Sequence, residues 1–351
     1  MSPPRIDQLF VSGVMETRAG QVPRIVSTLT FMDNLGAVKV RFGIGRMHYT
    51  VDPGLYALGN PGPDDPVFVS ANYKLSFDRL REALPGRNGW ILVLDTKGIN
   101  VWCAAGKGTF GTEELLQRIA TSNLEKIVNH RTIILPQLAG SGVAAFDVKR
   151  RSGFKVIYGP IEASDLPSFL DSGFKAAPSM RTKSFTITER LVLVPVEVIS
   201  AIKVGVIILA AMFLTSFLLT GASIDVAIRY SYNAALALLL GIIAGAVVTP
   251  LLLPWLPGRS FSLKGLYPGI AVVAIFLLLQ WHGQTGKEAF ELYAWLPVIP
   301  SVSTYLSMNF TGSSTFTSLS GVRREMRRAV PLQIAGATCG LVIWISSFFV
   351  H

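Results

Sequence analysis

The segment 100–107 contains the strongest candidate for a reactive residue in this chain, Cys103. It reads Asn-Val-Trp-Cys-Ala-Ala-Gly-Lys, and Cys103 is the only cysteine before Cys339. Asn100 is a good N-cap residue, which would put Cys103 in the first turn of a helix, where unpaired backbone N–H groups and the helix dipole favour an anion. A cysteine so placed ionises more readily, and its thiolate is a better nucleophile and metal ligand.

The neighbours of Cys103 leave room beside its sulfur atom. Ala104, Ala105 and Gly106 carry no bulky side chain, so a broad, flat partner could approach this face of the helix closely. Lys107 follows Cys103 by one turn and lies on the same side. The alternative is a buried, unreactive cysteine, because free cysteine is among the most often buried residue types. The composition of the segment leaves both interpretations open.

The chain as a whole is more apolar than an ordinary globular protein. Of its 351 residues, 50% are hydrophobic and only 15% are charged, and its mean hydropathy is +0.46. The charged residues concentrate in the first half, while the second half reads as successive apolar stretches. We therefore predict a water-soluble domain over residues 1–190, a linker over 191–198 and a transmembrane region over 199–351.

Several apolar stretches approach the length of about 20 residues that a helix needs to cross a bilayer. They are residues 199–219, 233–253, 266–281, 290–308 and 332–350. The fourth of them contains Glu291, Pro297 and Pro300. We expect its helix to be kinked, broken or packed against neighbouring helices.

The loop charges predict the orientation of this bundle. With the N-terminal domain in the cytoplasm, the cytoplasmic loops hold Arg259, Lys264, Arg323, Arg324, Arg327 and Arg328, and the outer loops hold Arg229 and Lys287. This distribution follows the positive-inside rule and predicts a multi-pass protein of the cytoplasmic (inner) membrane. Residues 1–21 contain no apolar signal segment, so we expect no export of the domain. We interpret the arginine cluster as an orientation signal that contacts lipid headgroups, with binding of nucleic acid or an anionic ligand as the alternative, and we expect no nucleic-acid partner.

The cysteine count excludes some cofactors. With only Cys103 and Cys339, this chain cannot supply the four cysteine ligands that an iron–sulfur cluster normally takes. Any electrons that the protein needs must therefore come from another protein. The 4 histidines are scattered without ligand spacing, which argues against a zinc site.

Alternating strand and helix patterns follow one another in the first half. We predict strands at residues 25–30, 37–42, 66–70, 90–95, 132–135 and 154–158, and helices at 72–84 with Asn72 as N-cap, 100–107, 112–127 and 165–170. Residues 1–21 read as polar and irregular. Repeated strand–helix units predict a mostly parallel sheet covered by helices.

Several polar and loop residues fall at the predicted carboxyl ends of these strands. They are Ser70, Asp95, Thr96, Tyr158 and, in the loop 137–142, Gln137, Leu138, Gly140 and Gly142. Ligands of such sheets bind beyond the carboxyl ends of the strands, so we predict one shared pocket. The alternative is that glycine and proline only turn the chain there.

The segment 100–107 closely resembles the cap-helix signature of the corrinoid protein of the microbial mercury-methylation pair. The soluble domain of that protein is similar to the corrinoid-binding part of the corrinoid iron–sulfur protein of acetyl-CoA synthesis. Further matching segments are 71–74 (Ala-Asn-Tyr-Lys), 92–96 (Leu-Val-Leu-Asp-Thr), 108–112 (Gly-Thr-Phe-Gly-Thr) and 135–138 (Leu-Pro-Gln-Leu). The resemblance implies an α/β Rossmann-like cobalamin-binding domain followed by an all-α transmembrane bundle of about five helices.

The same resemblance implies a function. Cys103 would be the lower axial ligand of the cobalt in a bound cobalamin. The protein would be a membrane-anchored methyltransferase that passes a methyl group from a methylated folate, through methyl-Co(III), to Hg(II) and forms methylmercury. A ferredoxin-like partner with 4Fe–4S clusters would supply electrons and could also present mercury.

The resemblance also suggests roles for other residues. Ser70 and Ser76 stand where the family commonly has threonine, so their hydroxyl groups would contact the corrin amides. Trp102 would anchor the helix in the core, and Lys107 would pair with a propionamide or phosphate or only cap the helix. The full set of expected cofactor-binding residues is Ser70, Asn72, Ser76, Asp95, Thr96, Asn100, Val101, Trp102, Cys103, Ala104, Ala105, Gly106, Lys107, Gln137, Leu138, Gly140, Gly142 and Tyr158.

Two other functions stay open at this point. A corrinoid methyl carrier could act on another soft metal or on a thiol, because the signature describes the cofactor and not the acceptor. A corrinoid-based membrane sensor or transporter would use the helices differently, and paired charges inside the membrane would favour transport.

Overall fold

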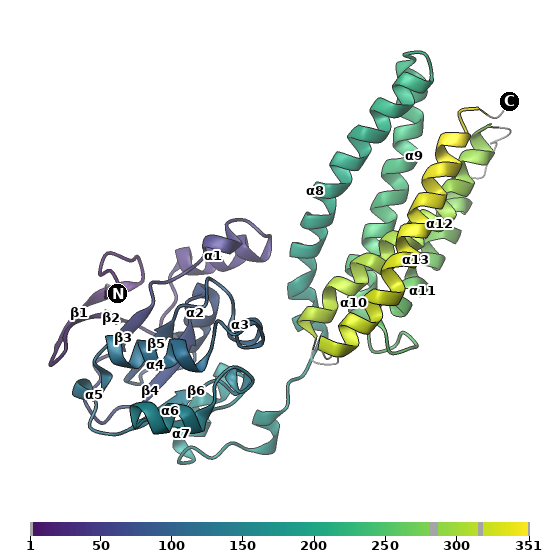
Figure 1. The fold of residues 1–351 in the computed structure, drawn as a ribbon. Coiled ribbons are helices and arrows are strands. Elements are labelled where there is room, and N and C mark those ends of the chain that lie inside the picture. Colours follow the sequence, from purple (N-terminus) through teal and green to yellow (C-terminus); the bar gives the residue numbers. More distant parts are fainter. Residues whose placement is uncertain (1–2, 281–286, 315–318, 350–351) are drawn as a thin grey trace. The chain divides into compact units, whose positions relative to one another are not determined.

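The computed structural model of the chain describes residues 3–280, 287–314 and 319–349 (Figure 1). It forms two compact units. The first comprises Met1–Val40 and Ile44–Lys183, and the second comprises Arg41–Gly43 and Ser184–His351.

A seven-stranded mixed sheet forms the centre of the first unit. Its strands are β1 Val11–Thr17, β2 Gly20–Ile25, β3 Gly54–Leu58, β4 Val67–Ala71, β5 Gly89–Leu94, β6 Thr132–Leu135 and β7 Lys155–Tyr158, in the spatial order β1-β2-β3-β5-β4-β6-β7. Strands β5, β4, β6 and β7 are parallel, β3 pairs antiparallel with β5, and β1 and β2 form a hairpin. The chain moves from β4 to β5 on one side and later returns to β6 on the other, so the strand order reverses between β4 and β6.

Helices cover both faces of this sheet (Figure 1). They are α1 Phe31–Arg41, α2 Lys74–Glu82, α3 Val101–Lys107, α4 Thr112–Thr121, α5 Leu124–Ile127, α6 Ala145–Ser152 and α7 Leu166–Asp171, with short 3-10 turns at Arg46–His48, Gln137–Ala139, Ala163–Asp165 and Pro178–Arg181. Side chains alternate across β4, so Val67 and Val69 pack with α3, α4 and α6 while Phe68 packs with α2 and α7. The result is a three-layer α/β domain.

The predicted strands at 66–70, 90–95, 132–135 and 154–158 are confirmed, as is helix 100–107. The predicted helix 112–127 is divided into α4 and α5, because Asn123 adopts a left-handed conformation with φ 48°. Residues 11–25, expected to be largely irregular, form the hairpin β1–β2, and β3 and α6 carry no prediction.

The prediction of strands at 25–30 and 37–42 is wrong: β2 ends at Ile25, residues 26–30 form no strand, and most of residues 31–42 form α1. Thr30 and Asp33 exchange hydrogen bonds at the start of this helix: the backbone N–H of Thr30 donates to Asp33 Oδ2 at 2.9 Å, and that of Asp33 donates to Thr30 Oγ1 at 3.2 Å. This reciprocal cap satisfies backbone groups that would otherwise be left unpaired. It outweighs the β propensity of the valine-rich stretch that follows.

The second unit is helical. Its elements are α8 Ile187–Leu219, α9 Ile224–Ile242, a π-helical turn Ile243–Val248, α10 Thr249–Leu252, α11 Phe261–Gln280, α12 Lys287–Asn309, a 3-10 turn Phe310–Ser313 and α13 Leu319–Ser346. By length and composition, four helical stretches among the described residues could cross a membrane: Ile187–Leu219, Ile224–Leu252, Phe261–Gln280 and Ser320–Ser346. The predicted ends at residues 281 and 350 lie outside the described residues.

The predicted linker 191–198 is helical and lies inside α8. A capping box starts this helix early: Thr186 Oγ1 accepts a hydrogen bond from the backbone N–H of Glu189 at 3.3 Å, and Glu189 Oε2 accepts one from that of Thr186 at 2.7 Å. Pro195 stands within the helix without ending it.

The predicted span 290–308 corresponds to α12, which is a helix but does not belong to the four apolar stretches. Pro297 and Pro300 lie inside it. Figure 1 shows α11, α12 and α13 side by side, and a Cβ atom added at Gly265 of α11 would overlap Ser307 of α12. This close packing of small residues explains how a helix with many polar residues is accommodated inside the unit.

Candidate functional site

Helix α3 begins as its sequence predicts. Asn100 is the N-cap, and its side-chain oxygen Oδ1 accepts a hydrogen bond from the backbone N–H of Cys103 at 2.9 Å. Gly108 ends the helix in a left-handed conformation with φ 83°. Cys103 is half-buried. The backbone N–H of Cys103 already donates to Asn100, so it is not free to stabilise a thiolate. The start of the helix therefore stabilises the thiolate less than the sequence predicted.

The two sides of α3 differ. Ala104 and Ala105 are buried in the core, so their small size serves the packing of α3 onto the domain and does not clear space beside the sulfur of Cys103, as their sequence had suggested. Gly106 and Lys107 are exposed, and a Cβ atom added at Gly106 would meet nothing within 4 Å. The helix surface is therefore open at Gly106, three residues after Cys103.

Asn72 holds the loop that leads into α3. Its Oδ1 accepts hydrogen bonds from the backbone N–H groups of Thr96 at 3.1 Å and Gly98 at 3.0 Å, and its Nδ2 donates to Asp95 Oδ1 at 3.3 Å. The predicted N-cap role of Asn72 is wrong, because Tyr73 occupies the cap of α2. Asn72 and Thr96 are both buried. They position α3 and do not present their side chains to a ligand.

Asp95 is also engaged within this loop. Its carboxylate accepts hydrogen bonds from Lys97, at 3.1 Å from the backbone N–H and 2.5 Å from Nζ. Burial raises the pKa of Asp95, but the bonds from Lys97 outweigh it and leave the pKa below its ordinary value. Lys97 and Gly98 are both left-handed, with φ of 58° and 70°. The ion pair thus accompanies an uncommon backbone turn immediately before the N-cap of α3.

The loop 136–143 packs against α3. A Cβ atom added at Gly142 would overlap the carbonyl oxygen of Phe110 and lie 2.9 Å from Cα of Ala105, so only glycine allows this approach. The Tyr158 hydroxyl donates to the carbonyl oxygen of Val143 at 2.7 Å, and burial raises the pKa of Tyr158. Gly142 and Tyr158 therefore hold the loop in place. The sequence analysis predicted them only as residues of the pocket.

Gln137 is held by a residue that the sequence did not suggest. Arg181 donates to the side-chain oxygen of Gln137 and to the carbonyl oxygens of Gly159 at 2.8 Å and Tyr158 at 2.9 Å. No sequence pattern links Gln137 to Arg181, because the two residues are 44 positions apart. Gly140 adopts ordinary helical angles at the end of the 3-10 turn.

A cavity of about 740 Å³ opens where the strand order reverses. Its walls come from β4, α2, the start of α3, the end of β6 and the segment after β7. The predicted residues that line it are Ser70, Ser76, Asn100, Val101, Trp102 and Leu138. Lining residues that the sequence reasoning missed include Tyr73, Arg79, Glu82 and Glu162. Open α/β sheets bind ligands at such a reversal point, so the cavity is the candidate site.

The interpretation of Trp102 changes with this geometry. Trp102 is half-buried and lines the cavity, so it does more than anchor the helix. Cys103 is the next residue on the same helix. The cap-helix segment thus contributes one wall of the cavity through residues 100–102, whereas Cys103 is not among the residues that line it.

A buried cluster of four charges fixes the opposite wall, α2. Lys74 Nζ lies 2.6 Å from carboxylate oxygens of both Asp33 and Asp78. Arg81 pairs with the same two carboxylates at 2.8 Å. Burial raises the pKa of Asp33, but the hydrogen bonds from Lys74, Thr30 and Arg81 outweigh it and leave the pKa well below its ordinary value. Two cations and two anions balance, which is what allows the cluster to be buried.

These residues fit a large flat cofactor with a metal. Cys103 is half-buried, and the helix surface at Gly106, one turn further on, is open. The adjoining cavity offers hydroxyl groups from Ser70 and Ser76 among mainly apolar walls. A site with few polar groups in an apolar setting is typical of cofactor pockets.

Comparison with known proteins shows that the first unit is similar to subunits of acetyl-CoA decarbonylase/synthase complexes. Residues 25–170 match the family described as CO dehydrogenase/acetyl-CoA synthase delta subunit. The acetyl-CoA decarbonylase/synthase complex subunit gamma of Archaeoglobus fulgidus is 33% identical over 142 residues, which cover 39% of this chain and 30% of the relative. That of Methanopyrus kandleri is 32% identical over 123 residues, covering 34% and 26%. The chain thus spans less than a third of the length of these relatives, and the helical unit lies outside the family match.

Proposed function

We propose that this chain is a cobalamin-dependent methyl-transfer protein in which Cys103 binds the cobalt. The observation that carries the proposal is the capped helix α3, which lines the cavity at the strand reversal through residues 100–102 and continues with the half-buried Cys103. The relation to acetyl-CoA decarbonylase/synthase subunits supports a corrinoid protein that works with protein partners. When bound, cobalamin supplies a metal that holds a methyl group between donor and acceptor.

The residues of the chain prepare the site for this task. Asn100 fixes the start of α3, and Asn72 fixes the loop before it. Gly106 keeps the side of the helix next to Cys103 open. Ser70 and Ser76 line the cavity, and their hydroxyl groups would donate hydrogen bonds to the amide groups at the edge of the cofactor.

The acceptor that we propose is Hg(II). The likeness of the segment 100–107 to the mercury-methylation signature supports this choice. The Cys103 thiolate is an electron-rich ligand, and ligand charge tunes a metal's reactivity. It would favour departure of the methyl group with its bonding electrons toward an electrophile such as Hg(II). The proposed donor is a methylated folate, and the proposed source of electrons is a ferredoxin-like partner with 4Fe–4S clusters.

The helical unit is proposed to anchor the protein in the cytoplasmic membrane with the first unit in the cytoplasm. Four stretches with the length and composition of membrane-crossing helices support the anchor. The basic residues at 259–264 and 323–328 support the orientation, although the structure places Lys264 within α11 and the arginines at 323–328 near the start of α13 instead of in loops.

Transfer to competing acceptors tests the proposed substrate. The full chain, loaded with isotopically labelled methylcobalamin, is offered Hg(II), a second soft metal ion and a small thiol in equal amounts. We expect labelled methylmercury as the main product. A main product methylated on the thiol or on the other metal would replace Hg(II) by that acceptor and leave the corrinoid assignment standing. Retention of all label on the protein would favour a sensor or transporter.

A further inference from the structure

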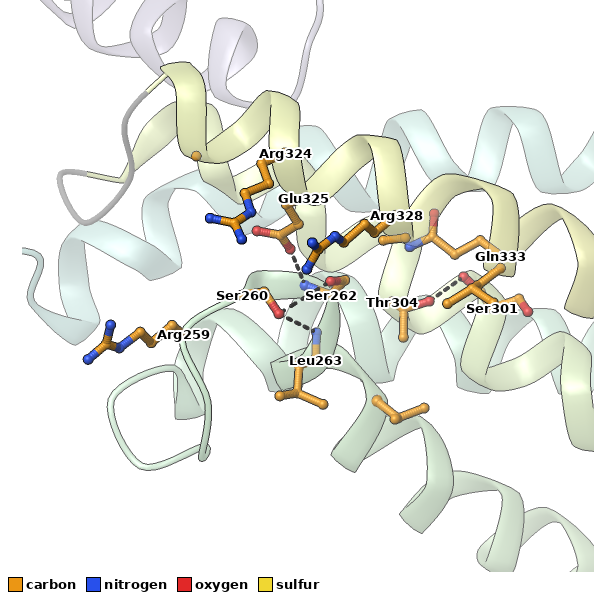
Figure 2. Close-up of a pocket in the computed structure, with 14 residues that line it drawn as sticks. Arg259, Ser260, Ser262, Leu263, Ser301, Thr304, Arg324, Glu325, Arg328 and Gln333 are labelled. Atoms are coloured by element: carbon orange, nitrogen blue, oxygen red, sulfur yellow. Dashed lines mark hydrogen bonds between the residues drawn. The ribbon is translucent and has the colours of Figure 1, made fainter.

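A second pocket, of about 710 Å³, lies within the helical unit between α11, α12 and α13 (Figure 2). Its lining combines guanidinium groups, polar groups that lie deeper along the helices, and aliphatic side chains. Such a combination suits an amphipathic ligand with an anionic end.

Three arginines give the pocket its charge. Arg259, Arg324 and Arg328 line it together with a single acid, Glu325. Glu325 is already engaged, because its Oε1 accepts a hydrogen bond from the backbone N–H of Ser262 at 2.6 Å. No salt bridge found within residues 3–280, 287–314 and 319–349 involves any of the three arginines. Figure 2 shows Arg324, Glu325 and Arg328 along one side of α13, opposite Ser260 and Ser262. The excess positive charge predicts a phosphate group as the ligand.

A buried amide points to a second feature of the ligand. Gln333 lines the pocket with only 7% of its surface exposed, and its Oε1 has no hydrogen-bond partner. The Ser301 hydroxyl donates to the carbonyl oxygen of Pro297 at 2.7 Å, and the Thr304 hydroxyl donates to that of Ser301 at 3.0 Å. Both hydroxyl protons are therefore used, so Gln333, Ser301 and Thr304 all offer acceptors. Buried acceptors are normally satisfied, which predicts a ligand that brings hydroxyl donors.

We propose that this pocket binds the headgroup of an anionic phospholipid that carries both a phosphate and a free glycerol hydroxyl. Arg324 and Arg328 would bind the phosphate, and Gln333 would accept a hydrogen bond from the glycerol. Leu263, Leu266 and Leu332 form the aliphatic part of the lining that acyl chains would contact. Basic pockets between helices at the cytoplasmic side are suited to such lipids. The inference rests on the proposed membrane placement and not on methyl transfer.

The chain offers a matched control on the same helix. Arg323 and Arg327 are exposed and do not line the pocket. They have the same charge and the same four-residue spacing as Arg324 and Arg328, and they point in a different direction around the helix. Replacing both arginines of either pair therefore removes the same charge from α13. Only the replacement of Arg324 and Arg328 changes the lining of the pocket.

The experiment measures lipid binding to the full chain in detergent by native mass spectrometry. The probes are phosphatidylglycerol, phosphatidic acid, which lacks the glycerol hydroxyl groups, zwitterionic phosphatidylethanolamine, and soluble glycerol phosphate. We expect phosphatidylglycerol to bind at least tenfold more tightly than phosphatidylethanolamine. R324Q/R328Q should abolish that difference and R323Q/R327Q should retain it, with circular dichroism and thermal unfolding showing that both variants are folded.

The remaining probes separate the parts of the proposal. Gln333→Leu should weaken the binding of phosphatidylglycerol more than the binding of phosphatidic acid. An equal loss of affinity for both lipids would contradict the hydroxyl contact. Equal losses in the two double variants would show non-specific attraction and overturn the pocket. Glycerol phosphate that competes as well as the lipid would assign the pocket to a soluble phosphate ester. Since none of these readouts uses methyl transfer, a failure here is distinct from a failure of the proposed function.

Discussion

The side-chain oxygen of Asn100 lies 2.9 Å from the backbone nitrogen of Cys103 and accepts its hydrogen bond. This contact fixes where α3 begins and therefore where the thiol stands relative to the cavity lined by the preceding residues. Asn72 secures the loop before the cap through Thr96 and Gly98. The site is thus positioned by two amide side chains: Asn72, which is buried, and Asn100, which also lines the cavity.

Replacing Asn100 by alanine removes the cap. We expect Asn100→Ala to lower the free energy of unfolding by about 1 kcal/mol and to weaken cobalamin binding, because α3 loses its fixed start. Asn100→Asp keeps the acceptor oxygen and should retain both. Chemical denaturation and equilibrium dialysis measure the two effects. Unchanged cobalamin affinity in the alanine variant would show that the cap does not position the site.

Gly106→Ala separates stability from binding. Gly106 lies within α3 with free space around it, so alanine should raise the stability by about 0.5–1 kcal/mol. The added methyl group would occupy the open side next to Cys103 and should weaken cobalamin binding. A more stable variant with full cobalamin affinity would mean that the cofactor does not approach this side of α3.

The same substitution at Gly142 should have the opposite effect on stability. Its Cβ atom would overlap the carbonyl oxygen of Phe110 and crowd Ala105, so we expect Gly142→Ala to destabilise the domain by about 1–3 kcal/mol. Thermal unfolding compared with Gly106→Ala measures the contrast. Equal stability of the two variants would contradict the close packing of the loop on α3.

The buried charge cluster predicts a dependence on pH. The folded pKa of Asp33 lies below its unfolded value of about 3.9. Its stabilising contribution is therefore complete above that value and is lost as the pH falls toward the folded pKa. Asp33→Asn should cost about 3–5 kcal/mol at pH 7, because Lys74 and Arg81 lose a buried partner.

Unfolding curves at pH 7 and at pH values below about 3.9 check this prediction. The stability difference between the original protein and Asp33→Asn should narrow as the pH falls. Asp147→Asn is the control, since the Asp147–Arg150 pair is exposed and such pairs contribute about 1 kcal/mol or less. A difference that stays constant with pH would contradict the low folded pKa of Asp33.

The sequence predicted the parts of this site that depend on local signals. The N-cap at Asn100, the buried strands β4 and β5 and the loop after β6 follow from residue type and spacing. Thr30 and Asp33 have the types and spacing of a helix cap, a signal that the strand prediction for this stretch did not use. The contact of Arg181 with Gln137 and the pairing of Lys74 with Asp33 depend on tertiary structure. No local pattern could have indicated them.

The central claim is that the sulfur of Cys103 binds cobalt, and a search for the cobalt–sulfur bond tests it most directly. The full chain is purified without oxygen, loaded with cobalamin, and measured by optical absorption and by X-ray absorption at the cobalt edge. We predict a sulfur neighbour of cobalt in the original protein and in Cys339→Ala, and its loss in Cys103→Ala with the fold retained. A cobalt–sulfur signal that persists in Cys103→Ala would contradict the central claim.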